Sequence, residues 1–386
     1  MKIALISNFV YPYRIDPTGK IAYTLAKNLA KKGHNVTVFS KCVSIKKIRN
    51  DKIEGVNYCG IRSIISVTGR DFKTIIKNNN FFSKFILWIF FLFTYILRKI
   101  NKKRFNEHEK FINKINKINN DLKYDLLIIF AGDFELIDVV KRKSIKAKKN
   151  ILYATDDWTL FTNNQKDFEM QINVLFDCIY AMEAVYNNVI IDKDKFRKLS
   201  PLFEIDKETQ RFTNKSKRPL GAYFGTLGRE RTSDLFFNKI EKLTEQNDFI
   251  FYTSDIEQLN QIKKQEIQIS GYVAKKEYQS ALAKADFLII LDNHGKYRNF
   301  IPSKIYEYIG TRKPILFFYY EENSPGYKVM QPYDLVLFIN LNKNNDTDSL
   351  NYFIENNFRK NSKKGLYDIY PDCSPEIFIN KMIGDL

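Results

Sequence analysis

The sequence is poor in the residues that hold metal ions or form disulfides. Its 386 residues include three histidines and four cysteines. The cysteines are Cys42, Cys59, Cys178 and Cys373. They are widely scattered and include no C-x-x-C pair, whereas disulfide frameworks and zinc sites need closer clustering. We therefore expect free thiols in a reducing compartment and no His-rich metal site.

Two further patterns are missing. The N-terminal "MKIALISNF" is no signal peptide, because its apolar run has the length of a strand and polar residues follow at once. The loop after this run contains "DPTGK" and lacks the G-x-G-x-x-G that a Rossmann oxidoreductase needs. These absences favour a cytoplasmic protein and argue against an oxidoreductase of that class.

Positive charge is abundant. The formal net charge is +18, and the sequence pI is near 9.4. Such a charge favours attraction to the phosphates of nucleic acid, nucleotides or an anionic membrane. No helix-turn-helix, zinc or stacking motif accompanies the charge, so we expect no nucleic-acid partner. With 44% hydrophobic residues the chain is globular, and its length allows two domains.

The first forty residues read as strand, loop, helix and strand. "KIALIS" is a continuous apolar run, typical of a strand buried on both faces. Residues 21–33 place apolar side chains on one helical face and end at Gly33, and "NVTVFS" follows as a strand. Apolar runs followed by polar residues return at 124–130, 150–158 and 187–193, as expected where parallel strands end at a ligand crevice.

A second series of strands and helices begins after a charged linker over residues 200–218. We predict an α/β fold of two Rossmann-like, doubly wound domains that face a central cleft. The N-terminal domain is expected over 1–215, with an apolar and basic insertion over 64–120. The C-terminal domain is expected over 216–386, and its last helix could pack back on the N-terminal domain.

Residues 81–104 stand outside this pattern. Thirteen mostly apolar residues, 85–97, precede the basic "RKINKKR". At about 1.5 Å per residue a helix of this length reaches roughly 20 Å, which is short of the roughly 30 Å of a bilayer core. Three interpretations stay open: a buried core helix, a helix in the membrane interface with the basic run at lipid phosphates, or a helix that spans the membrane.

Two stretches carry a family resemblance. Residues 1–40 end in "GHNVTVFS", and residues 299–316 read "NFIPSKIYEYIGTRKPIL". They resemble the opening and the "P-x-K-x-x-E-Y…G-x-P" donor motif of the group-1 family of retaining, nucleotide-sugar-dependent glycosyltransferases, which have the GT-B fold. The motif helix is expected to stop at Gly310, just before the strand "PILFF".

The resemblance implies roles for the motif residues. Glu307 is expected to accept hydrogen bonds from the ribose hydroxyls of the donor, and Lys304 to face its diphosphate. A nucleotide sugar needs both an acceptor for a cis-diol and positive charge for the leaving pyrophosphate. Ser303 and Tyr308 belong to the same predicted donor site. The alternative is an exposed Lys304–Glu307 ion pair, because residues three apart share a helical face.

The segment "YFGTLGRERTSDLF" opens the second domain as strand, glycine loop and helix. Gly225 and Gly228 would allow close backbone approach, and the helix N-terminus would offer N–H groups to a phosphate. The resemblance implies a basic residue here that faces the diphosphate, with Arg231 the first choice and Arg229 the second. The alternative is a tight strand-to-helix turn.

Three other loop residues are candidates for the same donor site. His294 and Arg298, in "LDNHGKYRNF", precede the motif and could contact sugar or phosphate. Gly19 in the first loop could let the backbone approach the diphosphate. The family's frequent second glutamate, eight residues before Glu307, is replaced by Asn299. This departure makes the finer assignment of the donor contacts depend on the structure.

In the first domain, "YATDDW" ends a strand with two carboxylates. At the carboxyl end of a sheet such a pair could accept a proton from an acceptor hydroxyl. We predict that Asp157 is the catalytic residue and that Asp156 caps the next helix. Capping alone is the alternative.

The resemblance implies a glycosyltransferase that moves a sugar from a nucleoside-diphosphate sugar to a glycan or lipid-linked acceptor, with retention, in cell-surface polysaccharide synthesis. We expect no cofactor and no metal, since Lys304 and Arg231 would neutralise the leaving group and no suitably placed D-x-D occurs. The expected location is cytoplasmic, on the inner face of an anionic membrane. The alternatives are a membrane-docked nucleotide-sugar-binding protein without turnover, and a nucleotide-sugar epimerase or hydrolase.

Overall fold

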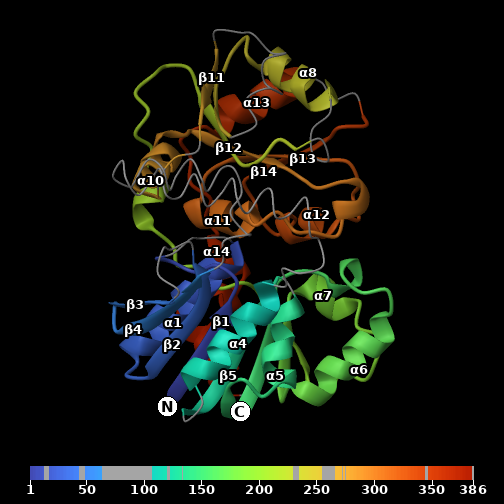
Figure 1. The fold of residues 1–386 in the computed structure, drawn as a ribbon. Coiled ribbons are helices and arrows are strands. Elements are labelled where there is room, and N and C mark those ends of the chain that lie inside the picture. Colours follow the sequence, from blue (N-terminus) through green and yellow to red (C-terminus); the bar gives the residue numbers. More distant parts are fainter. Residues whose placement is uncertain are drawn as a thin grey trace, which may run out of the picture. The chain divides into compact units, whose positions relative to one another are not determined.

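The computed structural model of the protein describes residues 1–12, 17–42, 48–62, 107–119, 122–132, 134–228, 234–253, 266–271, 273, 275–343 and 347–384. The chain forms two compact units, drawn in Figure 1. Unit 1 comprises Met1–Leu202 with Phe378–Leu386, and unit 2 comprises Phe203–Ile377. The charged segment that we predicted as a linker therefore belongs largely to unit 2. Its Asp206 accepts a hydrogen bond from Gln279 Nε2 at 2.5 Å.

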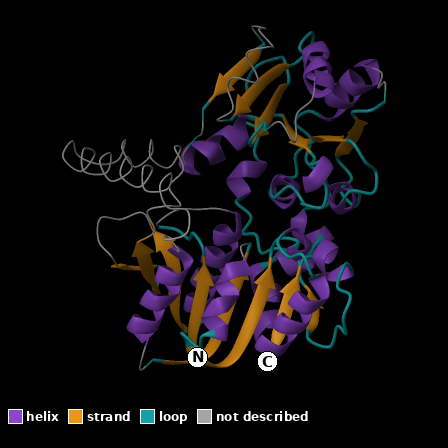
Figure 2. Ribbon diagram, turned by 45° about the vertical axis from the view of Figure 1, so that its right-hand side comes forward, coloured by secondary structure: helices purple, strands orange, loops and turns teal. Residues whose placement is uncertain are grey.

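The sheet of unit 1 has eight strands in the order β3-β4-β2-β1-β5-β6-β7-β8. The strands are β1 (Lys2–Ser7), β2 (Asn35–Cys42), β3 (Ile48–Ile53), β4 (Val56–Arg62), β5 (Lys123–Ala131), β6 (Lys146–Ala154), β7 (Cys178–Ala181) and β8 (Phe196–Lys198). All neighbours are parallel except β3 and β4, which are antiparallel. Figure 2 shows most arrowheads of this sheet along one edge.

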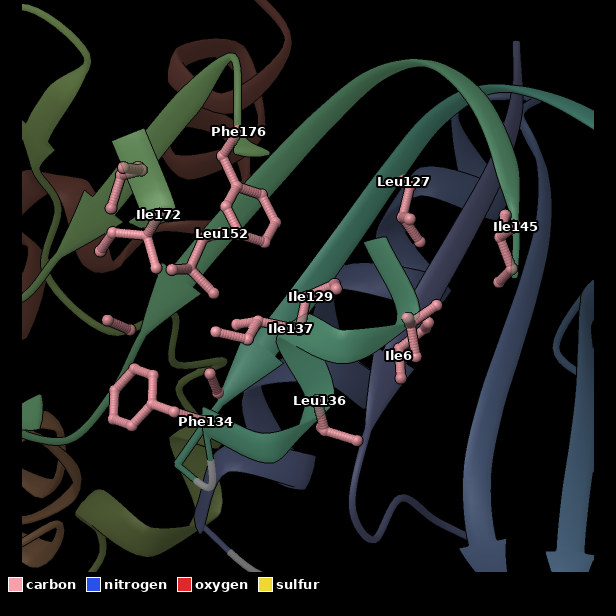
Figure 3. Close-up of a cluster of buried hydrophobic side chains, with 14 of the residues drawn as sticks. Ile6, Leu127, Ile129, Phe134, Leu136, Ile137, Ile145, Leu152, Ile172 and Phe176 are labelled. Atoms are coloured by element: carbon pink, nitrogen blue, oxygen red, sulfur yellow. The ribbon is translucent and has the colours of Figure 1, made fainter. Parts of the chain in front are cut away.

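Helices cover both faces of the first sheet. In the part of the unit that the structure describes they are α1 (Pro17–Lys31), α4 (Glu107–Asn119), η1 (Phe134–Ile137), α5 (Asp138–Lys141), η2 (Trp158–Leu160), α6 (Gln165–Leu175), α7 (Glu183–Asn187) and the Phe378–Gly384 part of α15 (Pro375–Gly384). Successive side chains of a strand point to opposite faces, so Ile3 and Leu5 pack with α1, while Ala4 and Ile6 pack on the other face. Figure 3 shows part of this second cluster.

The end of α15 completes the core of unit 1. The rings of Phe378 and Tyr153 lie 5.6 Å apart, and Tyr180 donates a hydrogen bond to the carbonyl of Lys381 at 3.0 Å. Lys32 Nζ also donates to Asn380 Oδ1 at 3.1 Å, so the chain returns to its first unit through apolar packing and hydrogen bonds.

The sheet of unit 2 has six strands, all parallel, in the order β11-β10-β9-β12-β13-β14. The strands are β9 (Leu220–Phe224), β10 (Asp248–Tyr252), β11 (Ile267–Ser270), β12 (Phe287–Leu291), β13 (Ile315–Tyr319) and β14 (Val336–Asn340). The helices among the described residues are η3 (Lys207–Gln210), α8 (Asp234–Leu243), α10 (Lys275–Lys284), η4 (Gly295–Tyr297), α11 (Lys304–Thr311), α12 (Pro325–Met330), α13 (Thr347–Asn357), α14 (Leu366–Ile369) and η5 (Pro371–Cys373).

Counted from its own first strand, the unit 2 sheet has the Rossmann order 3-2-1-4-5-6, with the chain reversing between β9 and β12. Unit 1 follows the same scheme around β1 and β5. The predicted α/β class with two Rossmann-like units is confirmed. All four cysteines are buried free thiols, as predicted.

Two local predictions were wrong. Residues 189–193 of the predicted strand 187–193 form a loop between α7 and β8, and the N–H groups of Ile190 and Ile191 bind the side chain of Glu169 instead of a neighbouring strand. The motif helix does not stop at Gly310. It runs to Thr311, and Arg312 ends it in the left-handed conformation with φ 59°.

Candidate functional site

The carboxyl edge of unit 2 is where the topology predicts a ligand. In open α/β sheets ligands bind outside the carboxyl ends of the strands, at the point where the strand order reverses. Here that point lies between β9 and β12. The segments that follow these strands are 225–228 and 292–303, and α11 follows the second. These are the segments in which most of the predicted donor-binding residues lie.

Helix α11 places Lys304 and Glu307 together. Lys304 Nζ lies 2.8 Å from Glu307 Oε2 and 2.7 Å from the hydroxyl of Tyr278 on α10. The Lys304 and Glu307 side chains are 33% and 16% exposed, so this is a partly buried pair and not the exposed one of the alternative interpretation. The opposite face of the helix packs into the core through Ile305, Tyr306, Tyr308 and Ile309. Core packing therefore fixes which side of α11 carries the charged pair.

Tyr278 links the charged pair to the end of β9. Its ring meets that of Phe224 edge to face at 4.9 Å, and Phe224 stacks on Tyr252 at 4.5 Å. Lys304 Nζ also lies 4.1 Å from the centre of the Tyr278 ring, within the range of a cation–π contact. Tyr278 lies outside the recognised motif, so sequence reasoning missed it. Only the packing of α10 against α11 brings it to the site.

The two other predicted motif residues differ in burial. Ser303 is exposed at the start of α11, and its side chain makes no capping hydrogen bond. Tyr308 is fully buried in the core, where burial raises the pKa of its hydroxyl well above the usual range. The donor contact of Ser303 stays a prediction. The donor contact of Tyr308 stays a prediction as well, although the side chain of Tyr308 points into the core.

Gly225 and Gly228, the two glycines after β9, have different surroundings at the position where a side chain would begin. A Cβ atom on Gly225 would lie 3.1 Å from the hydroxyl of Tyr223, which donates to the carbonyl of Thr226 at 2.8 Å. A Cβ atom on Gly228 would meet no atom of the described residues within 4 Å. Local packing accounts for Gly225, whereas nothing in the described protein requires glycine at 228. Arg229 and Arg231, predicted to face the diphosphate, lie outside the described residues.

A buried carboxylate organises the loop after β12. Asp292 is 1% exposed and accepts hydrogen bonds from Ser324 Oγ at 2.5 Å and from the Asn293 N–H at 2.9 Å. Ser324 caps α12 by accepting from the Tyr327 N–H. Polar residues directly after a buried strand were the signal that could have singled out Asp292.

Asn293 and His294 continue this loop. Asn293 Nδ2 donates to the carbonyl of Phe300 at 2.8 Å and so closes the loop. The His294 ring lies 4.3 Å from the ring of Tyr320, and its Nε2 is buried with no hydrogen-bond partner among the described residues. Arg298 is exposed. Packing against Tyr320 thus holds His294 in the loop after β12, and Arg298 is exposed in the same loop.

The carboxyl edge of unit 1 corrects the predicted helix cap, whereas the catalytic role of Asp157 stays a prediction. Asp157, not Asp156, is the cap: its Oδ1 accepts from the Thr159 N–H at 2.9 Å and from Thr159 Oγ1 at 2.8 Å, at the start of η2. Its side chain is buried. The more exposed Asp156 lies over Gly132, where an added Cβ atom would come within 2.7 Å of Asp156 Oδ2.

The N-terminus of α1 lies next to this aspartate. Thr18 Oγ1 lies 3.0 Å from Thr155 Oγ1, and both hydroxyls converge on the Cβ position of Gly132. Gly19 lies in the first turn of α1 and is buried, whereas the sequence placed it in a loop. The helix starts earlier than predicted because Pro17 is accommodated at its first position.

Within the described residues, no group of three or more His, Cys, Asp or Glu residues is placed to hold a metal ion. Within them, too, no helix has the length and apolar character needed to cross a membrane.

The sequence matches no protein-family model and no curated protein. The structure is similar to solved structures over its whole length. OtsA without ligand matches with a TM-score of 0.63 at 10% identity, covering 100% of this chain and 99% of that one. The Escherichia coli trehalose-6-phosphate structure with UDP-2-fluoro glucose gives 0.58 at 9% identity, covering 100% and 96%. HepE from Anabaena with UDP-glucose gives 0.58 at 10% identity, covering 100% and 98%.

These similarities establish the fold. The chain has the GT-B fold of two Rossmann-like domains, as the sequence motifs predicted. Identities near 10% leave the assignment of activity to the residues of the site.

Proposed function

We propose that this protein is a glycosyltransferase that moves a sugar from a nucleoside-diphosphate sugar to a glycan or lipid-linked acceptor. The observation that carries the proposal is the partly buried Lys304–Glu307 pair beside the strand reversal of unit 2. The GT-B fold supports it, and similar structures contain UDP-glucose or UDP-2-fluoro glucose. Cell-surface polysaccharide synthesis and retention at the anomeric carbon are parts of the proposal.

Each member of the pair has a role that suits a nucleotide sugar. Glu307 accepts hydrogen bonds from the two ribose hydroxyls, because a carboxylate offers two oxygens to a cis-diol. Lys304 turns from Glu307 to the diphosphate and stabilises the charge that develops as the glycosidic bond breaks. Tyr278, which now accepts from Lys304 at 2.7 Å, keeps the ammonium near this position.

The glycine loop supplies the backbone for the diphosphate. No atom of the described residues lies within 4 Å of the place where a Gly228 side chain would stand, and a glycine there lets a phosphate approach the backbone. Arg231, or else Arg229, adds a second positive charge. With Lys304 this charge neutralises the leaving group without a metal ion.

The acceptor binds at the carboxyl edge of unit 1. We assign the acceptor-facing carboxylate to Asp156 and revise the sequence-based choice of Asp157, because the Asp157 carboxylate is buried in the cap of η2. Asp156 is more exposed, and the hydroxyls of Thr18 and Thr155 lie beside it. A carboxylate among hydroxyls can accept from a sugar hydroxyl and orient it for transfer.

The test begins with a panel of nucleotide sugars in a thermal-shift assay. A donor at one hundred times its dissociation constant should stabilise the protein by about 2.7 kcal/mol. The stabilising donor is then incubated with p-nitrophenyl glycosides and octyl glucoside, and product is detected by mass spectrometry. Transfer supports the proposal. Stabilisation without product indicates a binding protein, free sugar indicates a hydrolase, and an isomerised nucleotide sugar indicates an epimerase.

We further propose that the protein is cytoplasmic and docks on the inner face of the membrane through residues 85–104, which lie outside the described residues. Five of the seven residues in "RKINKKR" are basic, and each adds about 1 kcal/mol near an anionic surface at moderate salt. Purified protein should float with vesicles that contain phosphatidylglycerol, less so at high salt and less again when Lys99, Lys102 and Lys103 become Glu. Protein that stays in the soluble fraction at low salt rules out the docking role.

A further inference from the structure

Glu169 on α6 is a fully buried carboxylate that only neutral donors satisfy among the described residues. Its Oε1 accepts from Trp158 Nε1 at 3.0 Å and from Gln165 Nε2 at 2.7 Å. Its Oε2 accepts from the N–H groups of Ile190 at 2.9 Å and Ile191 at 3.3 Å. Glu169 is 0% exposed, and the partners found for it within the described residues are these four uncharged donors. A buried charge is costly, so its presence asks for a reason beyond filling space.

The four donors come from three separate segments. Trp158 opens η2, Gln165 begins α6, and Ile190 and Ile191 lie in the loop between α7 and β8. Glu169 therefore ties the end of β6 to two other segments of unit 1. It also explains why residues 189–193 form a loop where the sequence predicts a strand, since two of their N–H groups are taken by this carboxylate.

Trp158 connects this network to the carboxyl edge of unit 1, where we place the acceptor and which we call the acceptor edge. Its ring packs in the core at 6.2 Å from each of Phe134, Phe168 and Phe196. Figure 3 shows Phe134 in the core cluster. It also shows Ile172, which lies one turn after Glu169 on α6. The aromatic packing holds the faces of the indole, and the hydrogen bond to Glu169 holds its Nε1 edge. The aromatic contacts and the hydrogen bond together therefore fix both the position and the orientation of the indole ring.

The backbone from Trp158 back to Asp156 has little freedom. Asp157 is fixed by its two hydrogen bonds to Thr159. On its other side Asp156 follows Thr155, whose N–H donates to the carbonyl of Ala131 at 3.2 Å. Asp156 also lies against Gly132, so a shift of the Trp158 ring would move the Asp156 carboxylate across this surface.

We propose that Glu169 is the positioning residue of the acceptor edge: through Trp158 it fixes the carboxylate of Asp156. This inference rests on the proposed function. Packing alone does not require the charge, because an apolar residue of similar size at 169 would fill the volume without a buried anion. A carboxylate with four donors gives the segment a single position, which orientation of an acceptor hydroxyl requires.

The test uses E169Q, E169A and W158F in the full chain, with E183Q as the matched control. Glu183 is an exposed glutamate of the same unit, paired with Lys198. E169Q keeps the volume but presents an amide N–H to groups that are themselves donors. W158F leaves Glu169 with its other donors. If E169A fails to fold, these two variants still test the inference.

Transfer is measured with the nucleotide sugar that most stabilises the wild type and with p-nitrophenyl glycosides as acceptor probes. We expect the acceptor kcat/KM of E169Q and E169A to fall by about 100-fold, since a misplacement of about 1 Å at a reacting group has this effect. The donor affinity of these variants, measured by calorimetry, should stay within about twofold of wild type. For the control E183Q, both the acceptor kcat/KM and the donor affinity should stay within about twofold of wild type. W158F should lose less than E169Q, in the same direction.

A second readout follows Trp158 itself. The chain has two tryptophans, so replacing Trp88 with phenylalanine leaves Trp158 as the single tryptophan, whose emission is read with excitation that tyrosine does not absorb. In that background E169Q should shift the emission to longer wavelength, as the indole loses its fixed place. Formate, which supplies a carboxylate of the right charge, should restore part of the emission and of the transfer rate of E169A.

Three results would overturn the inference. They are unchanged acceptor kinetics in folded E169Q, wild-type transfer by W158F, and an equal loss of donor affinity and acceptor kinetics, which would make Glu169 a general support of the fold. Absence of transfer by the wild type with every donor of the panel is a different result. It contradicts the proposed function and not the structural path from Glu169 to Asp156.

Discussion

The two units share one topology but carry different groups at the carboxyl edges of their sheets. In unit 2 the helix after β12 brings a cation and a carboxylate together, with Lys304 2.8 Å from Glu307. In unit 1 the described residues around Gly132 are Thr18, Thr155 and Asp156, which offer hydroxyl and carboxylate oxygens. The first arrangement suits a diphosphate and a ribose diol, and the second suits a sugar hydroxyl.

A buried ionisable side chain supports each unit, a lysine in unit 2 and a glutamate in unit 1. In unit 2 Lys313 is 0% exposed and donates to the carbonyls of Leu282, Ala283 and Ala285 at the end of α10. In unit 1 Glu169 accepts from four donors. The comparison indicates that the shared fold sets the position of the loops at the carboxyl edge of each sheet. Single polar residues in and around these loops then determine which ligand groups the edge suits.

The largest effect is expected for Lys304→Ala, which tests whether the cation of unit 2 acts in the transition state. We expect the transfer rate at saturating donor to fall by about 100- to 1000-fold, since charge develops on the diphosphate only as the bond breaks. Initial rates over a donor titration measure this. Lys343→Ala, which removes an exposed ion pair with Glu322, is the control. A higher Michaelis constant with an unchanged maximal rate would reduce Lys304 to a binding residue.

Glu307→Ala tests the other half of the pair. Loss of a charge-assisted contact to the ribose should weaken donor binding by about 2–3 kcal/mol, or roughly 30- to 150-fold. Calorimetry with the donor and with its nucleoside diphosphate measures the loss, and Glu322→Ala serves as the control. Equal affinity of variant and parent would remove Glu307 from the ribose site and break the proposed contrast between the two edges.

Lys313 makes the stability of unit 2 depend on pH. Burial lowers the pKa of Lys313 to about 7, against the attraction of Asp286. Between this value and about 10.4, the value for an unfolded lysine, the unfolded chain binds one proton more, so stability rises with pH. From pH 7 to 9 the slope should be at most about 1.4 kcal/mol per pH unit. Urea unfolding at pH 7, 8 and 9 measures it.

The variant for this prediction is Lys313→Met, with the exposed Lys360→Met as control. The methionine variant should lose the part of the slope that Lys313 contributes, whatever its absolute stability. Parallel slopes for the parent and Lys313→Met would show that the ammonium keeps its proton in the folded protein. Unit 2 would then hold a permanent buried cation, opposite to the anion of Glu169.

The smallest effect is the loss of stability expected for Asp157→Ala, and the comparison with Asp156→Ala distinguishes the neighbouring aspartates of unit 1. Asp157→Ala should cost about 1 kcal/mol of unfolding free energy, because it removes the cap of η2. Asp156→Ala should leave the unfolding free energy nearly unchanged and lower acceptor kcat/KM. Denaturant titration and acceptor kinetics on both variants give the comparison. The reverse result, with loss of transfer confined to Asp157→Ala, would restore the catalytic role that the sequence suggested.

Local patterns in the sequence determined the class of fold and the residues of the donor motif. Continuous apolar runs such as "KIALIS" identify strands buried on both faces, because a parallel sheet is covered by helices on each side. The pattern at 302–308 likewise predicted that Lys304 and Glu307 share one side of a helix, since the spacing of residues along a helix sets this directly. These properties depend on neighbours in the chain.

Tertiary structure decided which of these groups meet distant ones. The sequence showed no preference for Tyr278 as the partner of Lys304, because the contact depends on how α10 packs against α11. It misassigned the cap between Asp156 and Asp157, which differ in their surroundings and not in chemistry. It also predicted a strand at 187–193, where Glu169 takes the N–H groups that a strand would pair. Contacts between residues far apart in the chain leave no local pattern, so only the folded protein reveals them.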